Sequence, residues 1–319
     1  MGPVVRLDEL ERRLKLRELR ILLAVVKTGS MAKGAAELGI SQPNVSKAIS
    51  DLEHAFGVRL LDRSPRGVEA TPYGLALIGR GTAVFDELRY AVKDIAFLAD
   101  PTSGELRLGC SDFAAGAVGQ AIDRMSREYP RITFDVVSAD AVALRRELRG
   151  RNIELFVGIL DSSLSKDDFD TEILYDDPLV VVADAQHPLV RRRSIELAQL
   201  VNEAWVLPPT TNAAGSFVRD AFEKIGLAVP NTIVSTYSTI LRHNLIATAR
   251  FITILPKSML PVMARDHSLK ELPVHLPGQR RTMAIVALKN RTLSPIAKLF
   301  IENVCAVAKP TAKAKKNAI

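Results

Sequence analysis

Residues 29 to 66 read GSMAKGAAELGISQPNVSKAISDLEHAFGVRLLDRSPR, and this stretch predicts a helix-turn-helix that runs into a basic hairpin. Gly29 and Ser30 are suited to end the preceding helix and to cap the first helix of the motif. The apolar face of that helix is expected to comprise Ala35, Ala36 and Leu38. Gly39 then provides the residue without a Cβ that a tight helix end favours, so a turn of about three residues should separate the two helices.

The second helix of the motif has one apolar and one polar face. Ser41 can serve as its N-cap, and Pro43 lies in its first turn, where a missing N–H costs little. The apolar residues recur at spacings of three and four: Val45, Ile49, Leu52 and Phe56. The opposite face carries small or hydrogen-bonding side chains: Gln42, Asn44, Ser46 and Lys47. Periodicity alone would equally suit a two-helix hairpin of a bundle, but this polar face is typical of a helix in the major groove of DNA.

Four short motifs in one order resemble the winged helix-turn-helix of LysR-type transcriptional regulators. That family carries Ser-Gln-Pro-x-x-Ser, then Leu-Glu, then Gly-x-x-Leu-Phe-x-Arg, and then Thr-Pro-x-Gly. The matching segments here are residues 41–46, 52–53, 57–63 and 71–74. Leu61 stands where the family usually has Phe, which is an exchange of one apolar residue for another.

The resemblance implies sequence-specific binding to a double-stranded DNA operator. The residues that it places at the DNA are Ser30, Ser41, Gln42, Pro43, Asn44, Ser46, Lys47, Arg63 and Arg66. Gln42 can pair with an adenine edge, whereas Lys47 and Arg63 are expected to reach phosphates or the groove.

The placement of charge, more than its total, favours DNA binding. The formal net charge is +7, of which residues 1–100 account for +2 and residues 309–319 for +4. The basic side chains of the second helix and the hairpin are the ones expected to face the DNA: Lys47, Arg59, Arg63 and Arg66. The lysine-rich segment 309–319 cannot bury a core, so we expect a disordered, solvated tail there.

Composition bounds the domain count and the location. A chain of 319 residues is long enough for two or three cores. No stretch approaches the roughly 20 apolar residues that span a bilayer, and the N-terminus is too charged for a signal peptide, so we expect a cytoplasmic protein. Cys110 and Cys305 fit neither a disulfide framework nor a zinc site, and both thiols are expected to be buried.

A long helical pattern without internal proline runs from Thr71-Pro72 to about Ala99. Its apolar side chains follow the a and d positions of a coiled coil: Ile78, Phe85, Leu88, Val92 and Ile95. A narrow apolar seam on a helix this long must pack against another part of the protein. It could pack on its own domain, but we expect it to pack against a second chain as a dimerisation helix. A dimer of dimers, and hence a homotetramer, is implied by the family resemblance alone.

Beyond a break at residues 100–104, the pattern alternates strands and helices. Strands are expected at 105–110, 132–138 and 154–159, with helices at 114–129 and 142–149 between them. This βαβαβ order predicts parallel strands joined by right-handed crossovers. A second series is expected at 178–183, 204–207, 216–225, 232–235, 240–248 and 252–255, followed by a strand at 283–288 and a helix at 294–308.

We therefore predict an α/β protein with an N-terminal winged helix-turn-helix, a long linker helix and a two-lobed effector domain like the periplasmic binding proteins. Short matches to the LysR family support the last part: GELRLG at 104–109, HPL at 187–189 and LP at 255–256. Segments 12–17 and 205–209 are similar to the subgroup that includes regulators of galactose-binding proteins and of aromatic-acid catabolism. Arg250 and Phe251 replace a Gly-x-Gly that many members have before the Leu-Pro strand.

The expected boundaries follow from these segments. Residues 1–74 would form the DNA-binding domain, 75–100 the linker helix and 101–308 the effector domain. Within the last, lobe I would comprise about 104–174 and 280–308, and lobe II about 175–279.

Small polar side chains follow the predicted strands at the end where open α/β folds bind ligands. These candidate effector contacts are Ser111, Ser138, Thr210, Asn212, Tyr237 and Ser238. Each by itself is commonly just a helix cap, but the resemblance implies effector contacts at corresponding strand ends. The set suits a carboxylate, a sugar or an aromatic acid.

No catalytic motif accompanies these features, so we expect no enzyme, no cofactor and no metal site. Cys110 beside Ser111 and Asp112 could be a nucleophile, but no histidine lies in an obviously supporting context. A solute-binding protein remains an alternative that the missing signal peptide disfavours. An architectural DNA-binding protein is the other alternative, although DNA bending needs no two-lobed ligand domain.

Overall fold

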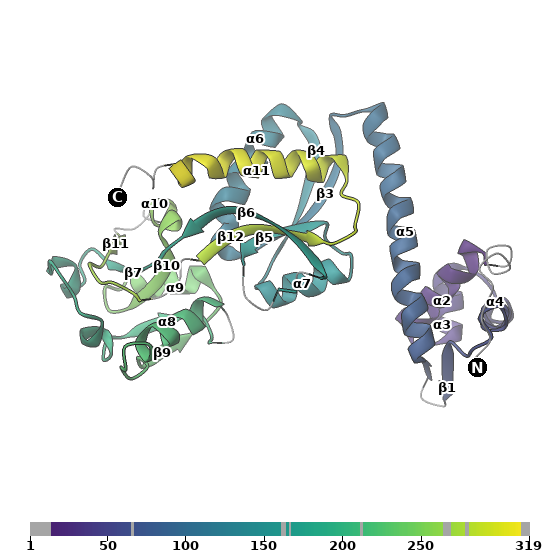
Figure 1. The fold of residues 1–319 in the computed structure, drawn as a ribbon, viewed down its shortest axis with the longest axis horizontal. Coiled ribbons are helices and arrows are strands. Elements are labelled where there is room, and N and C mark those ends of the chain that lie inside the picture. The colour runs from purple at the N-terminus through teal and green to yellow at the C-terminus, as the bar shows by residue number, and fades with distance from the viewer. Residues whose placement is uncertain are drawn as a thin grey trace. The chain divides into compact units, whose positions relative to one another are not determined.

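The computed structural model describes residues 14–64, 67–160, 164–165, 167–210, 213–263, 269–277 and 281–313 (Figure 1). The chain divides into two compact units, with the boundary between Val92 and Lys93. The long helix α5 (Pro72–Ala99) crosses this boundary. It begins where the sequence pattern placed it, at Pro72, and the Thr71 Oγ1 accepts the Gly74 N–H and so caps the first turn.

Three helices and a two-stranded hairpin precede α5 in the N-terminal unit. They are α2 (Leu16–Thr28), α3 (Met31–Leu38), α4 (Gln42–Phe56), β1 (Leu61–Ser64) and β2 (Gly67–Ala70). The three helices are followed by Gly29, Gly39 and Gly57, whose φ angles of 66°, 63° and 66° lie in the left-handed region. The predicted helix-turn-helix, with three residues between α3 and α4, is confirmed.

The core of this unit contains the inward faces of all three helices. The buried residues of α4 include three of the four predicted: Val45, Ile49 and Leu52. In α3, Ala35 is buried as predicted, but Ala36 is exposed and Leu38 is half-buried. Gly34 takes the inward position because α3 approaches α2 closely: a Cβ added to Gly34 would lie 3.1 Å from the Val25 side chain.

Lobe I of the second unit is built on a five-stranded sheet in the order β4-β3-β5-β12-β6. The strands are β3 (Ser103–Cys110), β4 (Arg131–Ser138), β5 (Leu155–Ile159), β6 (Phe169–Asp177) and β12 (Arg281–Leu288). β3 pairs in parallel with β4 and β5, which confirms the predicted βαβαβ arrangement. β12 pairs antiparallel with β5 and β6.

The sequence pattern did not predict β6. Its segment FDTEILYDD contains four acidic residues, so the apolar pattern of a strand is weak there. β6 lies at the edge of the sheet, and its middle is largely exposed. An edge strand needs little apolar surface because its pairing with one neighbour supplies the backbone hydrogen bonds.

Helices α6 (Ala115–Glu128), α7 (Ala141–Arg149) and α11 (Pro295–Lys313) belong to lobe I. α6 and α11 lie side by side (Figure 1). α11 continues five residues beyond Ala308, so the expectation of a disordered tail from residue 309 is wrong as far as Lys313. This extension contains Pro310, which is unfavourable inside a helix, so helix propensity does not explain it. Residues 314–319 lie outside the described residues.

Lobe II carries a second five-stranded sheet in the order β11-β7-β10-β8-β9. The strands are β7 (Leu179–Asp184), β8 (Trp205–Leu207), β9 (Thr232–Ser235), β10 (Ile252–Pro256) and β11 (Leu269–Glu271). The helices are α8 (Ala213–Glu223), α9 (Thr239–Ile246) and the short α10 (Leu260–Met263). One buried apolar cluster extends through both lobes, so they share a core.

The chain passes from lobe I to lobe II between β6 and β7, at Pro178. The predicted boundary at about 174–175 is therefore a few residues early, because β6 belongs to lobe I. The return at about residue 280 agrees with β12, which begins at Arg281.

Candidate functional site

The polar face predicted for α4 lies on the surface of the N-terminal unit. The exposed side chains are Ser41, Gln42, Pro43, Asn44 and Lys47, and Ser46 is half-buried. Ser41 is the N-cap residue, but its side chain makes no capping hydrogen bond, contrary to expectation. Ser30 does cap α3, since its Oγ accepts the Lys33 N–H at 3.4 Å. The α4 face thus presents hydrogen-bonding groups over an apolar base, as groove recognition requires.

The basic hairpin forms a wing, in which β1 and β2 pair antiparallel with Arg63 opposite Val68. Arg63 is exposed, whereas Arg66 lies outside the described residues. The Val68 N–H donates to the Gly29 carbonyl at 3.0 Å and ties the wing to the turn after α2. Gly67 permits this approach, because its φ is +135° and an added Cβ would lie 2.8 Å from the Gly29 oxygen.

Two side chains hold the base of the wing. The Glu53 Oε1 of α4 accepts the N–H groups of Leu60 and Leu61 at 2.8 and 3.2 Å. The Thr71 Oγ1 donates to the Arg59 carbonyl at 2.8 Å, and the Thr71 N–H donates to the Leu60 carbonyl at 3.0 Å. These contacts explain why the Leu-Glu and Thr-Pro-x-Gly motifs accompany the helix, because they set the position of the wing relative to α4.

The predicted dimerisation seam on α5 is only partly free in the single chain. Three of its five residues are exposed: Leu88 by 45%, Val92 by 67% and Ile95 by 68%. Ile78 instead packs against the core of the N-terminal unit, and Phe85 is half-buried. Val84 and Leu98 are exposed on the same helix and were not in the predicted set. The stripe from Val84 to Leu98 is therefore the apolar surface of α5 that a second chain could cover.

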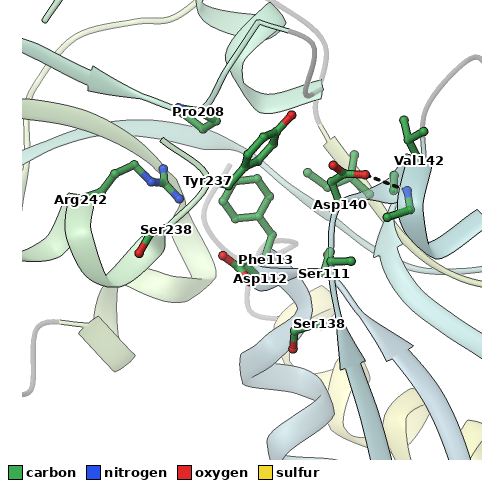
Figure 2. Close-up of a pocket in the computed structure, with 14 residues that line it drawn as sticks. Ser111, Asp112, Phe113, Ser138, Asp140, Val142, Pro208, Tyr237, Ser238 and Arg242 are labelled. Atoms are coloured by element: carbon green, nitrogen blue, oxygen red, sulfur yellow. Dashed lines mark hydrogen bonds between the residues drawn. The ribbon is translucent and has the colours of Figure 1, made fainter. Parts of the chain in front are cut away.

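A cavity of about 400 Å³ lies between the two lobes of the second unit (Figure 2). It brings together four of the six predicted effector residues: Ser111 and Ser138 of lobe I, and Tyr237 and Ser238 of lobe II. We call it the interlobe cavity. Its volume is within the range of small-molecule sites.

Thr210 does not line the interlobe cavity, so its predicted grouping with the other residues is wrong. It lines a separate pocket of about 210 Å³ in lobe II, together with Gly215 and Arg219. α8 packs tightly against the segment after β8, since a Cβ on Gly215 would lie 2.4 and 2.3 Å from the carbonyl oxygens of Pro208 and Pro209. This close packing turns the segment that carries Thr210 towards α8. Asn212 lies outside the described residues.

Polar side chains around the interlobe cavity differ in their hydrogen bonds. The Ser238 Oγ accepts the Leu241 N–H at 3.1 Å and so caps α9. The Asp140 Oδ1 accepts the Ala143 N–H at 2.8 Å and caps α7. The Ser111 Oγ is buried and has no hydrogen-bond partner among the described residues. Because a buried hydroxyl without a partner is costly, Ser111 is the hydroxyl best placed to bind a ligand atom.

The sequence interpretation missed Arg242, the one basic side chain among the described residues that line the interlobe cavity. Arg242 lies on α9 and is 2% exposed. Figure 2 shows its guanidinium directed from α9 towards Phe113 and Asp112 of lobe I. The guanidinium carbon lies 6.0 Å from the centre of the Phe113 ring, within range of a cation–π contact.

Asp112 of lobe I was also missed as a cavity residue. Its Oδ2 accepts the Thr239 hydroxyl of lobe II at 2.7 Å, so a hydrogen bond bridges the lobes. Thr239 in turn accepts a hydrogen bond from the Arg242 guanidinium at 3.1 Å. Burial lowers the pKa of Arg242, and the negative charge of Asp112 opposes that change.

No sequence signal singled out Arg242 or Thr239. Ligand contacts were expected at strand ends, whereas Arg242 is one turn into a helix, where an arginine ordinarily faces solvent. Asp112 directly follows Ser111, so a pattern that includes one more residue past each strand end would contain it.

Neither cysteine is placed as a nucleophile. Cys110 is buried, and burial together with the Asp112 charge raises the pKa of its thiol to about 12. The reactive thiolate is therefore scarce at neutral pH. Cys305 is half-buried, contrary to the expectation of a buried thiol, and its Sγ lies 3.2 Å from the Glu172 Oε1 at the exposed edge strand.

Within the part of the chain that the structure describes, no three His, Cys, Asp or Glu side chains are grouped so that they could hold a metal ion. The helices in the same described segments are also too short or too polar to cross a membrane.

Comparison with protein families divides the chain as the structure does. Residues 16–75 match the bacterial regulatory helix-turn-helix protein model of the lysR family. Residues 99–308 match the LysR substrate binding domain. The first match contains α4 and the wing, and the second contains both lobes and the interlobe cavity.

Individual relatives extend over nearly the whole chain. The regulator TdcA of Escherichia coli K12 is 27% identical over 289 residues, which cover 90% of this chain and 91% of TdcA. The regulator GbpR of Azospirillum brasilense is 28% identical over 291 residues, which cover 91% of this chain and 85% of GbpR. Two relatives at nearly equal identity do not single out a subgroup, so the subgroup stays a prediction.

Among solved structures, a cysteine-to-aspartate variant of full-length OxyR from Pseudomonas aeruginosa has the same fold, with a TM-score of 0.64 at 22% identity. The match covers 93% of this chain and 97% of OxyR. The helix-turn-helix with its wing, the two-lobed domain and the two family matches lead to one conclusion: the chain belongs to the LysR family of DNA-binding transcriptional regulators, which respond to small-molecule effectors and form oligomers.

Proposed function

We propose that this regulator recognises its operator through the exposed face of α4 and contacts the flanking DNA backbone with the wing. Gln42 and Asn44 supply the donors and acceptors that a base edge requires, and Lys47 and Arg63 supply positive charge for phosphates. The exposure of this face is what supports the assignment, together with the Glu53 and Thr71 contacts that hold the wing beside it.

The interlobe cavity is the proposed effector site, with Ser111, Ser138, Tyr237 and Ser238 among its contacts. The observation that carries this proposal is a cavity lined from both lobes in which a buried hydroxyl, that of Ser111, has no partner among the described residues. A ligand that contacts both lobes favours one degree of lobe closure over another. The change in lobe closure then alters how the chains pair, and hence the spacing between their DNA-binding domains.

The remaining parts of the proposal concern assembly and location. Two chains pair through the exposed stripe of α5, and pairs combine into a homotetramer. The protein acts in the cytoplasm, where its DNA lies, and works as a regulator without catalysis or a cofactor. The raised pKa of the Cys110 thiol supports a role without catalysis, because this thiol is the one nucleophile candidate that the sequence offered.

The test combines footprinting with one matched pair of variants. Genome-wide footprinting identifies the operator, and the neighbouring operon identifies the metabolite for a reporter assay. Ser111→Ala should raise the metabolite concentration for half-maximal response by about 2- to 12-fold, which is the value of one hydrogen bond. Thr210→Ala serves as the control, since Thr210 lines the other pocket. A shift in Thr210→Ala and none in Ser111→Ala would place the effector site outside the interlobe cavity.

A further inference from the structure

Arg242 carries a buried charge that the protein does not neutralise directly. Its hydrogen-bond partners are uncharged: the guanidinium donates to the Thr239 Oγ1 at 3.1 Å and to the Ile254 carbonyl at 3.5 Å. Its Nε has no hydrogen-bond partner among the described residues. No carboxylate of those residues lies within ion-pair distance of the guanidinium. A buried cation in this condition is costly, so an anion that reaches it is strongly favoured.

The interlobe cavity gives an outside anion access to this charge. Arg242 lines the cavity, and its guanidinium is directed into the space between the lobes (Figure 2). Asp112 approaches from lobe I but stops at Thr239, whose hydroxyl it accepts at 2.7 Å. The threonine hydroxyl therefore separates the two charges, so the positive charge of the guanidinium is left without an ion-pair partner at the cavity.

On the assumption that the interlobe cavity is the effector site, we propose that it takes a small monocarboxylate with a largely apolar body, bound through Arg242. The carboxylate pairs with the Arg242 guanidinium, and the Ser111 hydroxyl contacts a second polar atom of the same ligand.

The number of charges in the lining favours a single negative charge on the ligand. Asp112 and Asp140 are both in the lining, so its described residues supply two carboxylates to one guanidinium. One added negative charge can be paired by Arg242, whereas a dicarboxylate or a phosphate dianion would place a further charge near these acids. Asp140 caps α7 through its hydrogen bond to the Ala143 N–H, which holds its carboxylate in place.

The rest of the lining favours an apolar body. It consists mainly of carbon surface: Phe113, Ala139, Ala141, Val142, Ile159 and Pro208. Such surface offers few hydrogen bonds to a polyhydroxylated molecule, so a sugar would lose its water without replacement. An aliphatic or aromatic acid loses few hydrogen bonds to water when its apolar body enters the cavity.

Matched acids and amides test the proposal on the full-length protein. Isothermal titration calorimetry would compare benzoate with benzamide and hexanoate with hexanamide, because each pair has one shape and differs in charge. Phthalate and phenyl phosphate provide dianions of similar size. We expect at least one acid of the two pairs to bind about 10- to 100-fold more tightly than its amide, as for a charge-assisted hydrogen bond. The dianions should bind more weakly than the monocarboxylate that binds best.

Two substitutions in the cavity should shift binding in opposite directions. Arg242→Gln should reduce acid binding to the level of the amide. Asp112→Asn keeps an acceptor for Thr239 but removes a repelling charge, so acids should bind several-fold more tightly. Arg219→Gln is the matched control, because Arg219 is in the same lobe but pairs with Asp220 at the surface. Val142→Trp fills the cavity, since Val142 is exposed in its lining.

The outcomes separate this inference from the proposed function. If acid and amide bind equally well and Val142→Trp abolishes the binding of both, the preference for a monocarboxylate is refuted. The interlobe cavity then remains the effector site. Acid binding that survives Val142→Trp would overturn both. Absence of binding by every acid at millimolar concentration, in wild type and in Asp112→Asn, would also overturn the inference. If Arg242→Gln fails to fold, two measurements still test the inference. They are the ratio of acid to amide affinity in the wild type and the increase in acid affinity in Asp112→Asn.

Discussion

Replacing Gly74 by alanine should loosen the attachment of the wing, and the structure allows the size of the effect to be worked out. Gly74 is in the first turn of α5, where an added Cβ would lie 2.1 Å from the Leu60 carbonyl oxygen and 3.4 Å from the Ala70 Cβ. The same carbonyl accepts the Thr71 N–H at 3.0 Å. The alanine methyl can be accommodated only if the start of α5 moves away from the wing, which weakens that hydrogen bond.

The opposing contributions have different sizes. Overpacking costs about 1–3 kcal/mol, and a lost hydrogen bond adds about 0.5–1.5 kcal/mol. Removing a glycine from a helix gains about 0.5–1 kcal/mol. We expect Gly74→Ala to destabilise the N-terminal unit by about 1–3 kcal/mol. Gly79→Ala, on the same helix with nothing within 4 Å of its added Cβ, should stabilise it by about 0.5–1 kcal/mol.

Urea unfolding followed by far-ultraviolet circular dichroism would measure both variants. Trp205 is the only tryptophan of the chain and is fully buried in the second unit, so its fluorescence gives an internal control that should not change. Hydrogen exchange at the amides of residues 59–71 should accelerate in Gly74→Ala alone, and operator affinity should fall with it. Wild-type stability and exchange in Gly74→Ala would show that the close approach at Leu60 does not constrain the wing.

Three further predictions concern DNA reading, assembly and pH. Gln42→Ala should lose roughly 1–3 kcal/mol of discrimination at one base position of the operator. Arg63→Ala should weaken binding to every DNA sequence and reduce the dependence of DNA affinity on salt concentration. Unchanged operator affinity of both variants at fixed salt would contradict the assignment of α4 as the DNA-reading helix. Val92 and Ile95 are exposed, so replacing both with Asp should leave the single chain folded but dissociate dimers, and light scattering that shows the wild-type mass would disprove the seam. Burial lowers the pKa of His187 below its ordinary 6.5, so the second unit should lose stability as the pH falls below that value, because the unfolded chain then binds the proton more readily. His187→Asn should reduce this loss in thermal unfolding across that pH range, and an unchanged pH dependence would refute the role of this histidine.

Local pattern was enough to predict the N-terminal unit. Gly39 between two apolar repeats predicted the turn, and the buried positions of α4 followed from their spacing. Such features depend on residues within one or two helical turns of each other, which is the range over which periodicity is informative. The parallel β3, β4 and β5 were predicted for the same reason, since short strands alternating with helices permit few topologies.

The effector candidates divided according to tertiary packing. Ser111, Ser138, Tyr237 and Ser238 line one cavity, and each lies at or just after the end of a strand, where open α/β folds form their clefts. Thr210 follows the same rule in the sequence but lies in another pocket, because the tight packing of Gly215 redirects its segment. A residue's position along the chain does not reveal which of two pockets it faces.

The sequence by itself determined the family, the winged helix-turn-helix and the two-lobed effector domain, and it predicted the DNA-reading helix and a ligand site between the lobes. Tertiary structure alone decided the chemistry of that site, since Arg242 on α9 and Asp112 after β3 become neighbours of one cavity only when the lobes pack together. The physical reason is that an arginine in a helix is ordinary until its surroundings exclude water. Burial, which depends on residues far away in the chain, is what makes an unpaired charge costly and therefore selective for an anion.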